Sequence, residues 1–291
     1  MRLSSCLTLL STLAVGSAFS TGLRSAPFLT GSPIAPSFSR SCARSSSNSA
    51  LSMKTIAVVG ASGLLASECV YQALKNGDSV VALTRNPSNL KIPQGSGGAE
   101  AGNTLTDPNL TLIGGSVTNP SDVAKMFEGQ VDGVVVALGG KTSDVGDTML
   151  TDGTTNVINA MKENNVKRLS VVTSIGAGDS KDQAPFFFKI LMMTAMKKIF
   201  ADKNNQENVV MNSGLEYCIV RPGGLTVEPP TGVINVIEGE AGSITRADVA
   251  QFCLDSVTLD DFPYIGKTPC ISSVGGTSWV KDRSGAARGE M

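Results

Sequence analysis

A glycine-containing turn is the first feature of this sequence that could bind an anion. The apolar run 56–59 ends at Gly60, and Gly63 and Ala66 follow at intervals of three residues. A buried strand that ends in such a turn and continues into a helix brings free backbone N–H groups to a dinucleotide pyrophosphate. The turn predicts cofactor contacts from Gly60, Ala61, Ser62, Gly63, Leu64 and Leu65. Short glycine turns are common after strands, so an ordinary turn is the alternative interpretation.

The end of the next apolar run, 79–84, favours NADP(H) as the cofactor. A carboxylate at this point would bind the ribose 2′-hydroxyl of NAD, whereas an arginine suits a 2′-phosphate. Thr84 is followed by Arg85, and the segment 80–87 contains no acidic residue. The planar guanidinium of Arg85 could bind the phosphate through two hydrogen bonds. The alternative is that Arg85 is only a solvated loop charge.

Two later loops are expected at the same edge of the sheet. The first follows a strand at 110–113 and contains Ser116 and Val117, where an adenine ring is usually contacted. The second ends the run 131–138 and contains Ala137, Leu138, Gly139 and Gly140. Open α/β sheets bind ligands at the carboxyl ends of their strands, and two glycines there permit close approach. A tight turn would explain the glycine pair equally well.

These loops require an alternation of strands and helices, and the hydrophobic pattern supplies it. Short β-branched runs are expected to form strands at 56–59, 79–84, 110–113, 131–138, 168–173 and 217–220. Helices are expected at 64–75, 119–127, 149–164, 184–211 (either continuous or broken) and 246–257. The pattern predicts a single α/β domain with a Rossmann-like, doubly wound parallel sheet. The glycine-rich segment 95–102 reads as a surface loop, and 266–291 shows no motif.

Composition excludes several kinds of chemistry. The 291 residues include no histidine, which rules out Ser-His-Asp triads, Cys-His pairs and His-ligated metals, and no acidic cluster suggests another metal site. The formal charge is −1, and it falls to about −5 without the four arginines of residues 1–52, which argues against a nucleic-acid surface. The absence of long apolar runs argues against a transmembrane helix. Cysteines 69, 218, 253 and 270 form no CxxC pair and are expected to be core thiols.

The first 52 residues have the composition of a cleaved presequence. Residues 1–18 resemble a signal peptide, and residues 19–52 are rich in serine, carry arginines and contain no acid. This arrangement, with Ser17-Ala18-Phe19 at the junction, resembles the two-part presequences of algal plastids. It predicts a plastid protein whose folded domain comprises residues 53–291. Simple secretion and a mitochondrial presequence are the alternatives.

Several motifs together resemble an atypical short-chain dehydrogenase/reductase of the NAD(P)H-binding, NmrA-like group. They are GASGLLA, TRNP, VVTSIGAG, ADKNNQE, SGLEYCIVRPGGL and ITRADVA, over about residues 54–257. The resemblance implies a small-molecule substrate, catalytic roles for Ser174 and Lys203, and cofactor contacts from Thr173, Ser174, Lys203, Pro222, Gly223, Gly224 and Leu225. Substrate-side elements are expected at 176–200 and 225–245.

The sequence departs from the family at the residue that usually donates a proton. The family tyrosine precedes the lysine by four residues, and here Ile199 occupies that position before Lys203. General acid catalysis typically contributes about 10²- to 10⁴-fold. A conjugated acceptor, such as a quinone or flavin, could instead take its proton from water or Ser174. The alternative is a non-catalytic NADP(H)-binding regulator or assembly factor.

The Phe/Met-rich segment 186–196 allows several interpretations. It contains three phenylalanines in succession, followed by aliphatic residues and methionines. Core packing is one interpretation; a surface for a planar substrate or a protein partner is the other. We expect the chain to be a monomer or a weak dimer.

Overall fold

The computed structural model describes residues 38–39, 53–139 and 147–273. The chain divides into two units, residues 1–34 and 35–291, and all described residues belong to the second. The predicted presequence lies mostly outside the described residues and stays a prediction. Its one described part, β1 (Phe38–Ser39), pairs antiparallel with β9 (Val233–Val236).

The second unit is built on a sheet of nine strands in the order β1-β9-β11-β7-β6-β5-β2-β3-β4. The strands from β4 to β11 in this order run parallel, and β9 is antiparallel to β11. The parallel strands are β2 (Thr55–Val59), β3 (Ser79–Thr84), β4 (Leu110–Gly114), β5 (Gly133–Val136), β6 (Arg168–Val172), β7 (Glu216–Pro222) and β11 (Cys270–Ser272). A smaller parallel pair joins β8 (Gly224–Thr226) to β10 (Ser243–Thr245).

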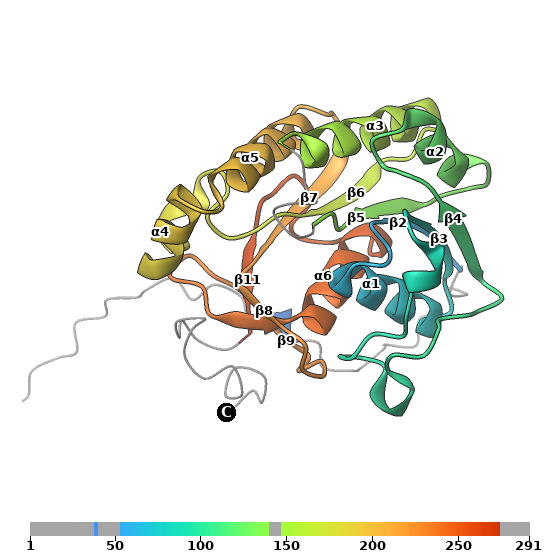
Figure 1. The fold of residues 1–291 in the computed structure, drawn as a ribbon, viewed down its shortest axis with the longest axis horizontal. Helices are drawn as coiled ribbons and strands as arrows, with labels where there is room; N and C mark the ends of the chain where they lie inside the picture. The colour runs from blue at the N-terminus through green and yellow to red at the C-terminus, as the bar shows by residue number, and fades with distance from the viewer. Residues whose placement is uncertain (1–37, 40–52, 140–146, 274–291) are drawn as a thin grey trace, which may run out of the picture. The chain divides into compact units, whose positions relative to one another are not determined.

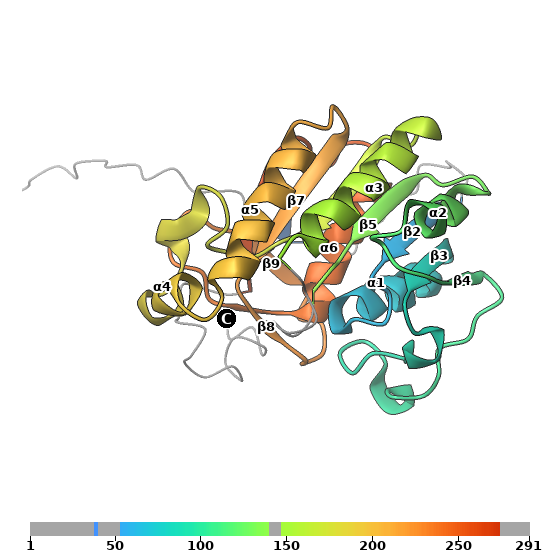
Figure 2. The same cartoon turned by 45° about the horizontal axis from the view of Figure 1, so that its top comes forward.

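Helices cover both faces of the sheet, as Figures 1 and 2 show. One face carries α1 (Leu64–Lys75) and α6 (Arg246–Thr258); the other carries α2 (Pro120–Ala124), α3 (Met149–Glu163) and α5 (Lys197–Met211), and α4 (Phe186–Met193) precedes α5. Each face has its own core cluster, centred on residues such as Phe252 and Met161 respectively. The central strands are buried on both faces, which explains their continuous apolar runs.

This architecture confirms the predicted doubly wound α/β fold, and cysteines 69, 218, 253 and 270 are free and buried, as expected. One detail of the sequence interpretation is corrected, and one strand is added. The segment 95–102 is only partly a surface loop, because Gly95 and Gly97 are buried and Gly95 donates a hydrogen bond to Glu68 Oε1 at 2.9 Å. The segment after residue 266 contains β11, which extends the sheet beyond β7.

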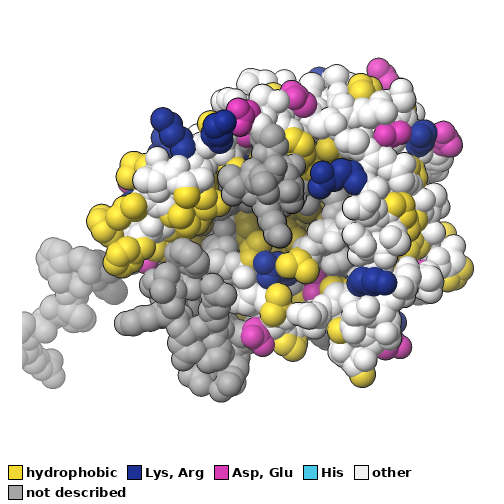
Figure 3. Space-filling view, viewed as in Figure 1, with side chains coloured by type: hydrophobic (Ala, Val, Ile, Leu, Met, Phe, Trp, Pro, Cys, Tyr) yellow, Lys and Arg dark blue, Asp and Glu magenta, His cyan; other side chains and the backbone are white. Residues whose placement is uncertain are grey.

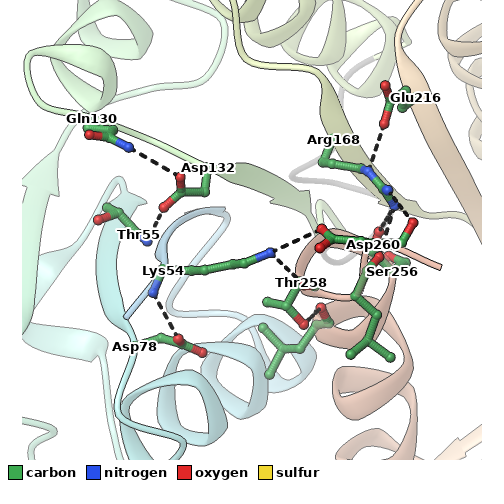
Figure 4. A network of polar contacts seen from close by, with 12 residues as sticks. Lys54, Thr55, Asp78, Gln130, Asp132, Arg168, Glu216, Ser256, Thr258 and Asp260 are labelled. Carbon is green, nitrogen blue, oxygen red and sulfur yellow. Dashed lines mark hydrogen bonds and ion pairs between the residues drawn. The ribbon is translucent and has the colours of Figure 1, made fainter. Parts of the chain in front are cut away.

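Polar contacts fasten the amino-terminal edge of the sheet to the end of α6 (Figure 4). Lys54 Nζ donates to the carbonyl of Thr258 at 2.6 Å, and Arg168 donates to the carbonyls of Leu259 and Asp260 at 3.2 and 2.9 Å. These cations satisfy carbonyl groups at and just beyond a helix C-terminus, where the helix dipole also favours positive charge. The fastened edge is opposite the edge at which the loops described below converge.

Candidate functional site

A cavity of about 870 Å³ lies where the carboxyl ends of the parallel strands meet. Its walls come from the turn between β2 and α1, the ends of β3, β5 and β6, and the loop after β4. One residue each from α3, β8 and α6 and two from α5 and its start complete the lining. Figure 3 shows the molecule hollowed near its centre, with Lys and Arg side chains at the rim. The cavity therefore occupies the crevice at which open α/β sheets bind ligands.

The glycine turn has a geometry that only glycine adopts without strain. Gly60 has φ of +82°, and a Cβ at this position would lie 2.8 Å from the carbonyl oxygen of Ala137. The backbone N–H groups of Gly60 and Ala61 both donate to the carbonyl of Leu83, at 3.0 and 3.1 Å. The turn is thus fixed between the ends of β3 and β5, the two strands that flank β2.

The first turn of α1 presents backbone donors to the cavity. Gly63 is the N-cap residue, no side chain caps the helix, and its first turn contains no acidic residue. Leu64 and Leu65, whose N–H groups begin the helix, both line the cavity. Unpaired N–H groups and the positive end of the helix dipole together favour an anion here.

Arg85 lies on the cavity wall next to this helix end. Its side chain is exposed, and no hydrogen bond or ion pair holds it within the described part of the chain. The preceding residue, Thr84, is fixed by a 2.7 Å hydrogen bond between its hydroxyl and that of Ser62. The site therefore offers a guanidinium whose donors are available to a ligand, on a strand end connected to the glycine turn.

The loop after β4 forms the adjoining wall, through Ser116 and Val117. Asp122 holds this loop by accepting a hydrogen bond from the N–H of Ser116 at 3.0 Å, and this bond lowers the pKa of Asp122. Gly115 has no room for a Cβ, which would lie 2.7 Å from Asp122 Cβ. The wall is positioned by its own helix, α2, before any ligand is bound.

Lys203 supplies a partly buried amine on the opposite wall. Its Nζ donates to the carbonyl of Thr173 at 3.1 Å, at the end of β6. Burial lowers the pKa of Lys203 to about 8, although the negative charges of Glu207 and Asp202 act in the other direction. The amine therefore titrates near neutral pH, where a lysine could exchange a proton.

A buried ion pair supports this wall from behind. Arg221 donates to both carboxylate oxygens of Glu207, at 3.0 and 2.7 Å, and Thr173 Oγ1 donates to the same carboxylate at 2.6 Å. Arg221 also pairs with Asp179. Two hydrogen-bonded carboxylates surround the guanidinium, so a charge that would be costly to bury alone is compensated. The network fixes the end of β6, from which Thr173 reaches the cavity, to α5, which carries Lys203.

The structure brings most of the predicted site residues to the cavity. The residues that line it are Gly60, Ser62, Gly63, Leu64, Leu65, Thr84, Arg85, Ser116, Val117, Ala137, Leu138, Gly139, Thr173, Lys203 and Leu225. Ala61 is buried and does not line it. Gly140 lies outside the described residues.

Ser174 and most of the motif 222–225 are placed elsewhere. Ser174 Oγ donates to the carbonyl of Ile175 at 3.0 Å and does not line the cavity. A Cβ on Gly223 would lie 2.0 Å from the carbonyl oxygen of Gly242, so this glycine permits close packing of two backbone segments. Of the two predicted substrate-side elements, each contributes one lining residue: Met196 and Leu225.

The sequence interpretation missed several lining residues. They are Val59, Leu83, Gly115, Thr118, Met149, Val172 and Arg246. Some adjoin predicted residues, but Met149 and Arg246 come from helix starts far along the chain. Arg246 is the first residue of α6, whose N-cap Thr245 accepts a hydrogen bond from the N–H of Asp248 at 3.0 Å.

The cavity wall is positively charged and contains no tyrosine. Among its lining residues, Arg85, Lys203 and Arg246 are cations and none is an Asp or Glu. The chain has three tyrosines, of which Tyr71 is in α1, Tyr217 is in β7 and Tyr264 packs against Phe252 and Phe262. Ile199 is buried. No phenol therefore replaces the missing family acid.

The described residues contain neither a candidate metal site nor a candidate membrane-spanning helix. In residues 38–39, 53–139 and 147–273, no His, Cys, Asp and Glu side chains cluster in threes as a metal site requires. Over the same ranges, no helix has the length and apolar character needed to cross a membrane.

Comparisons with known proteins agree with this geometry. Residues 60–260 match a family model described as NAD(P)H-binding. An uncharacterized chloroplastic protein of Arabidopsis thaliana is 29% identical over 225 residues, covering 73% of this chain and 75% of the relative.

Solved structures share the fold at low sequence identity. A short-chain dehydrogenase/reductase from Veillonella parvula in complex with NADP has a TM-score of 0.61 at 17% identity, covering 77% of this chain and 96% of that one. ChuY, an anaerobilin reductase from Escherichia coli O157:H7, has a TM-score of 0.57 at 23% identity, covering 75% and 96%. The chain belongs to the NAD(P)H-binding family, and the resemblance to atypical short-chain dehydrogenase/reductases is confirmed.

Proposed function

We propose that this protein is an NADP(H)-dependent oxidoreductase that transfers hydride to a conjugated small molecule such as a quinone or a flavin. The observation that carries the proposal is a single cavity bordered by an uncapped helix N-terminus, an unpaired arginine and a lysine whose pKa is about 8. The first two features suit a phosphorylated dinucleotide. The third suits chemistry near neutral pH.

The described residues fit NADP(H) at three points. The N–H groups at the start of α1 would bind the pyrophosphate, and the absence of a Cβ on Gly60 keeps the turn close to Ala137. Arg85 would bind the 2′-phosphate, since its guanidinium is exposed at the end of β3. The Veillonella neighbour was solved with NADP, which agrees with this choice of cofactor.

The cofactor would supply the hydride, and the protein would orient the acceptor and manage a proton. Lys203 Nζ holds a proton on the cavity wall, whereas Ser174 is hydrogen-bonded away from it. An acceptor with a delocalised ring system spreads the incoming charge, so the reaction depends on positioning more than on a strong acid. The E. coli neighbour is a reductase by name, which agrees with the direction of transfer proposed here.

A non-catalytic NADP(H)-binding regulator or assembly factor is the second candidate. The observation that favours it is Ile199, a buried aliphatic side chain at the position of the family's proton donor. Such a protein would keep the cofactor site and lose turnover.

We further propose that the protein acts in a plastid. The chloroplastic relative from Arabidopsis supports this location, as does the composition of residues 1–52.

A steady-state assay separates the two functions. NADPH oxidation would be followed at neutral pH with a panel of quinones and flavins, using wild type and Lys203→Met. Saturable turnover that falls at least about tenfold in the variant, with NADPH binding retained, supports the oxidoreductase. Intact NADPH binding without turnover on any acceptor would favour the regulator.

A further inference from the structure

The outer side of α4 is an exposed apolar surface next to the cavity. Phe186 and Phe187 are 70% and 74% exposed, and Met193 is 69% exposed. Ile190 and Leu191 are also exposed. This surface, which we call the α4 face, comprises these five residues and lies at the left edge of Figure 3, where hydrophobic side chains gather.

The α4 face is not a loosely packed part of the core. The opposite side of the same helix supplies the core contacts: Met192 is buried in a cluster with Ile175 and Phe200, and the Phe188 ring meets that of Phe200 edge-on at 5.8 Å. Phe186, Ile190 and Met193 recur at the spacing of one helix face. The helix is therefore anchored by one side and presents the other to its surroundings.

Lysines lie within and next to the helix that carries the α4 face. The segment 181–198 contains four lysines and one aspartate, a formal charge of +3 in a chain whose net charge is −1. Lys181 and Lys197 are exposed, while Lys189 and Lys198 pair with Asp182 and Asp147 at 3.5 and 3.0 Å. An apolar helix face with lysines beside it is complementary to a surface that has an apolar interior and an anionic outer layer.

We propose that the α4 face docks on the anionic surface of a lipid bilayer, with its phenylalanines in the interfacial region. Short amphipathic helices with aromatic and aliphatic side chains on one face and lysines around it bind membranes in this way. The eight-residue helix is about 12 Å long and about 10 Å wide, far below the roughly 800 Å² per partner of a standard protein interface. Lysine margins would also repel each other in a pair of identical copies.

Docking would bring the cavity close to the membrane. Met196 lies in the short link between α4 and α5, three residues beyond Met193, and it lines the cavity. This consequence rests on the proposed function: a conjugated acceptor dissolved in lipid would reach the cavity from the side of α4. The binding itself does not depend on turnover.

The test is flotation of the full-length chain with vesicles, without cofactor. One set contains phosphatidylcholine and phosphatidylglycerol in equal parts, and the other contains phosphatidylcholine alone. Wild type should float with the anionic vesicles. Phe186→Ser with Phe187→Ser should reduce the bound fraction by more than about tenfold, and Lys181→Gln with Lys197→Gln by about 5-fold per charge.

Matched controls remove equivalent groups elsewhere. Leu112→Ser with Met211→Ser removes two exposed apolar side chains outside the α4 face, and Lys162→Gln with Lys167→Gln removes two exposed charges. Both should float as wild type does. All variants carry the same residues 1–52, so any membrane affinity of that segment contributes equally.

Three results would overturn the proposal. They are no flotation of wild type, equal flotation of the phenylalanine variant, and equal binding of wild type to neutral vesicles. Light scattering identifies one competing occupant: a wild-type dimer that becomes monomeric in the phenylalanine variant, without vesicle binding, would make the α4 face a self-association surface. Failure of the function would show in the NADPH assay alone.

Discussion

Replacement of Arg85 by alanine should change the cofactor preference of this protein more than its overall affinity for dinucleotides. Arg85 lines the cavity at the end of β3, and its guanidinium has no partner within the described structure. The substitution therefore breaks no internal ion pair. The loss is confined to whatever the guanidinium binds.

The expected size follows from the contact. A hydrogen bond to a charged group contributes about 1.5–3 kcal/mol. Arg85 could form two such bonds with the phosphate, but it is exposed, and solvent screening keeps the combined contribution of both bonds within the range for one. The dissociation constant for NADPH should rise about 10- to 150-fold. NADH lacks the 2′-phosphate, so its dissociation constant should change less than about 3-fold.

The assay is a fluorescence titration of each cofactor into wild type, Arg85→Ala and Arg85→Lys. The lysine variant keeps the charge but loses the planar fork, so its NADPH affinity should be intermediate. Lys91→Ala is a matched control, because Lys91 is an exposed cation outside the cavity. The preference for NADPH should also weaken as salt increases. Equal losses for NADPH and NADH would refute the assignment of Arg85 to the phosphate.

Two further predictions concern the turn and the lysine. Gly60→Ala should lower the free energy of unfolding, measured by urea titration, by about 1–3 kcal/mol, because Gly60 has φ of +82° and an added Cβ would lie 2.8 Å from the carbonyl oxygen of Ala137. Gly129→Ala is the control, because a Cβ at Gly129 meets nothing within 4 Å. It should change the free energy of unfolding by less than about 0.5 kcal/mol. Equal effects would show that the turn is not strained by a side chain. The pKa of Lys203 is about 8 in the folded protein against 10.5 for an ordinary lysine, so the unfolded chain binds more protons between these values and stability should rise with pH across that window. Urea unfolding should show this rise in wild type and lose it in Lys203→Met; an unchanged rise in the variant would assign it to another group.

The local hydrophobic pattern was enough to predict the strands and helices that depend on residues close together in the sequence. The strand and helix around Gly60 form where the apolar runs place them, and β3 ends next to Arg85 as expected. Burial of a strand on both faces leaves a continuous apolar run, which is visible without any tertiary information. The order of the loops along the chain then predicts which ones meet at the carboxyl edge.

Other features had no local signal. β11 contains three residues, and it forms because Cys270 and Ile271 pair with β7 about 50 residues earlier. Glu68 looked like an ordinary helix residue, yet its carboxylate fixes the turn at Gly95 and Ser96. Contacts across such separations depend on how the chain packs, and single-residue propensities do not encode them.

The sequence alone determined the fold, the glycine turn, the position of the phosphate-binding candidate and the absence of a tyrosine acid, because each follows from residue type and short-range spacing. Tertiary structure decided how those groups can act. It engaged the Ser174 hydroxyl with the carbonyl of Ile175, buried Lys203 enough to lower its pKa to about 8, and brought Met196 and Arg246 to the wall. It also decided that one side of α4 packs while the other remains exposed. Solvent exposure and pKa depend on neighbours that are distant in the chain, so only the folded arrangement fixes them.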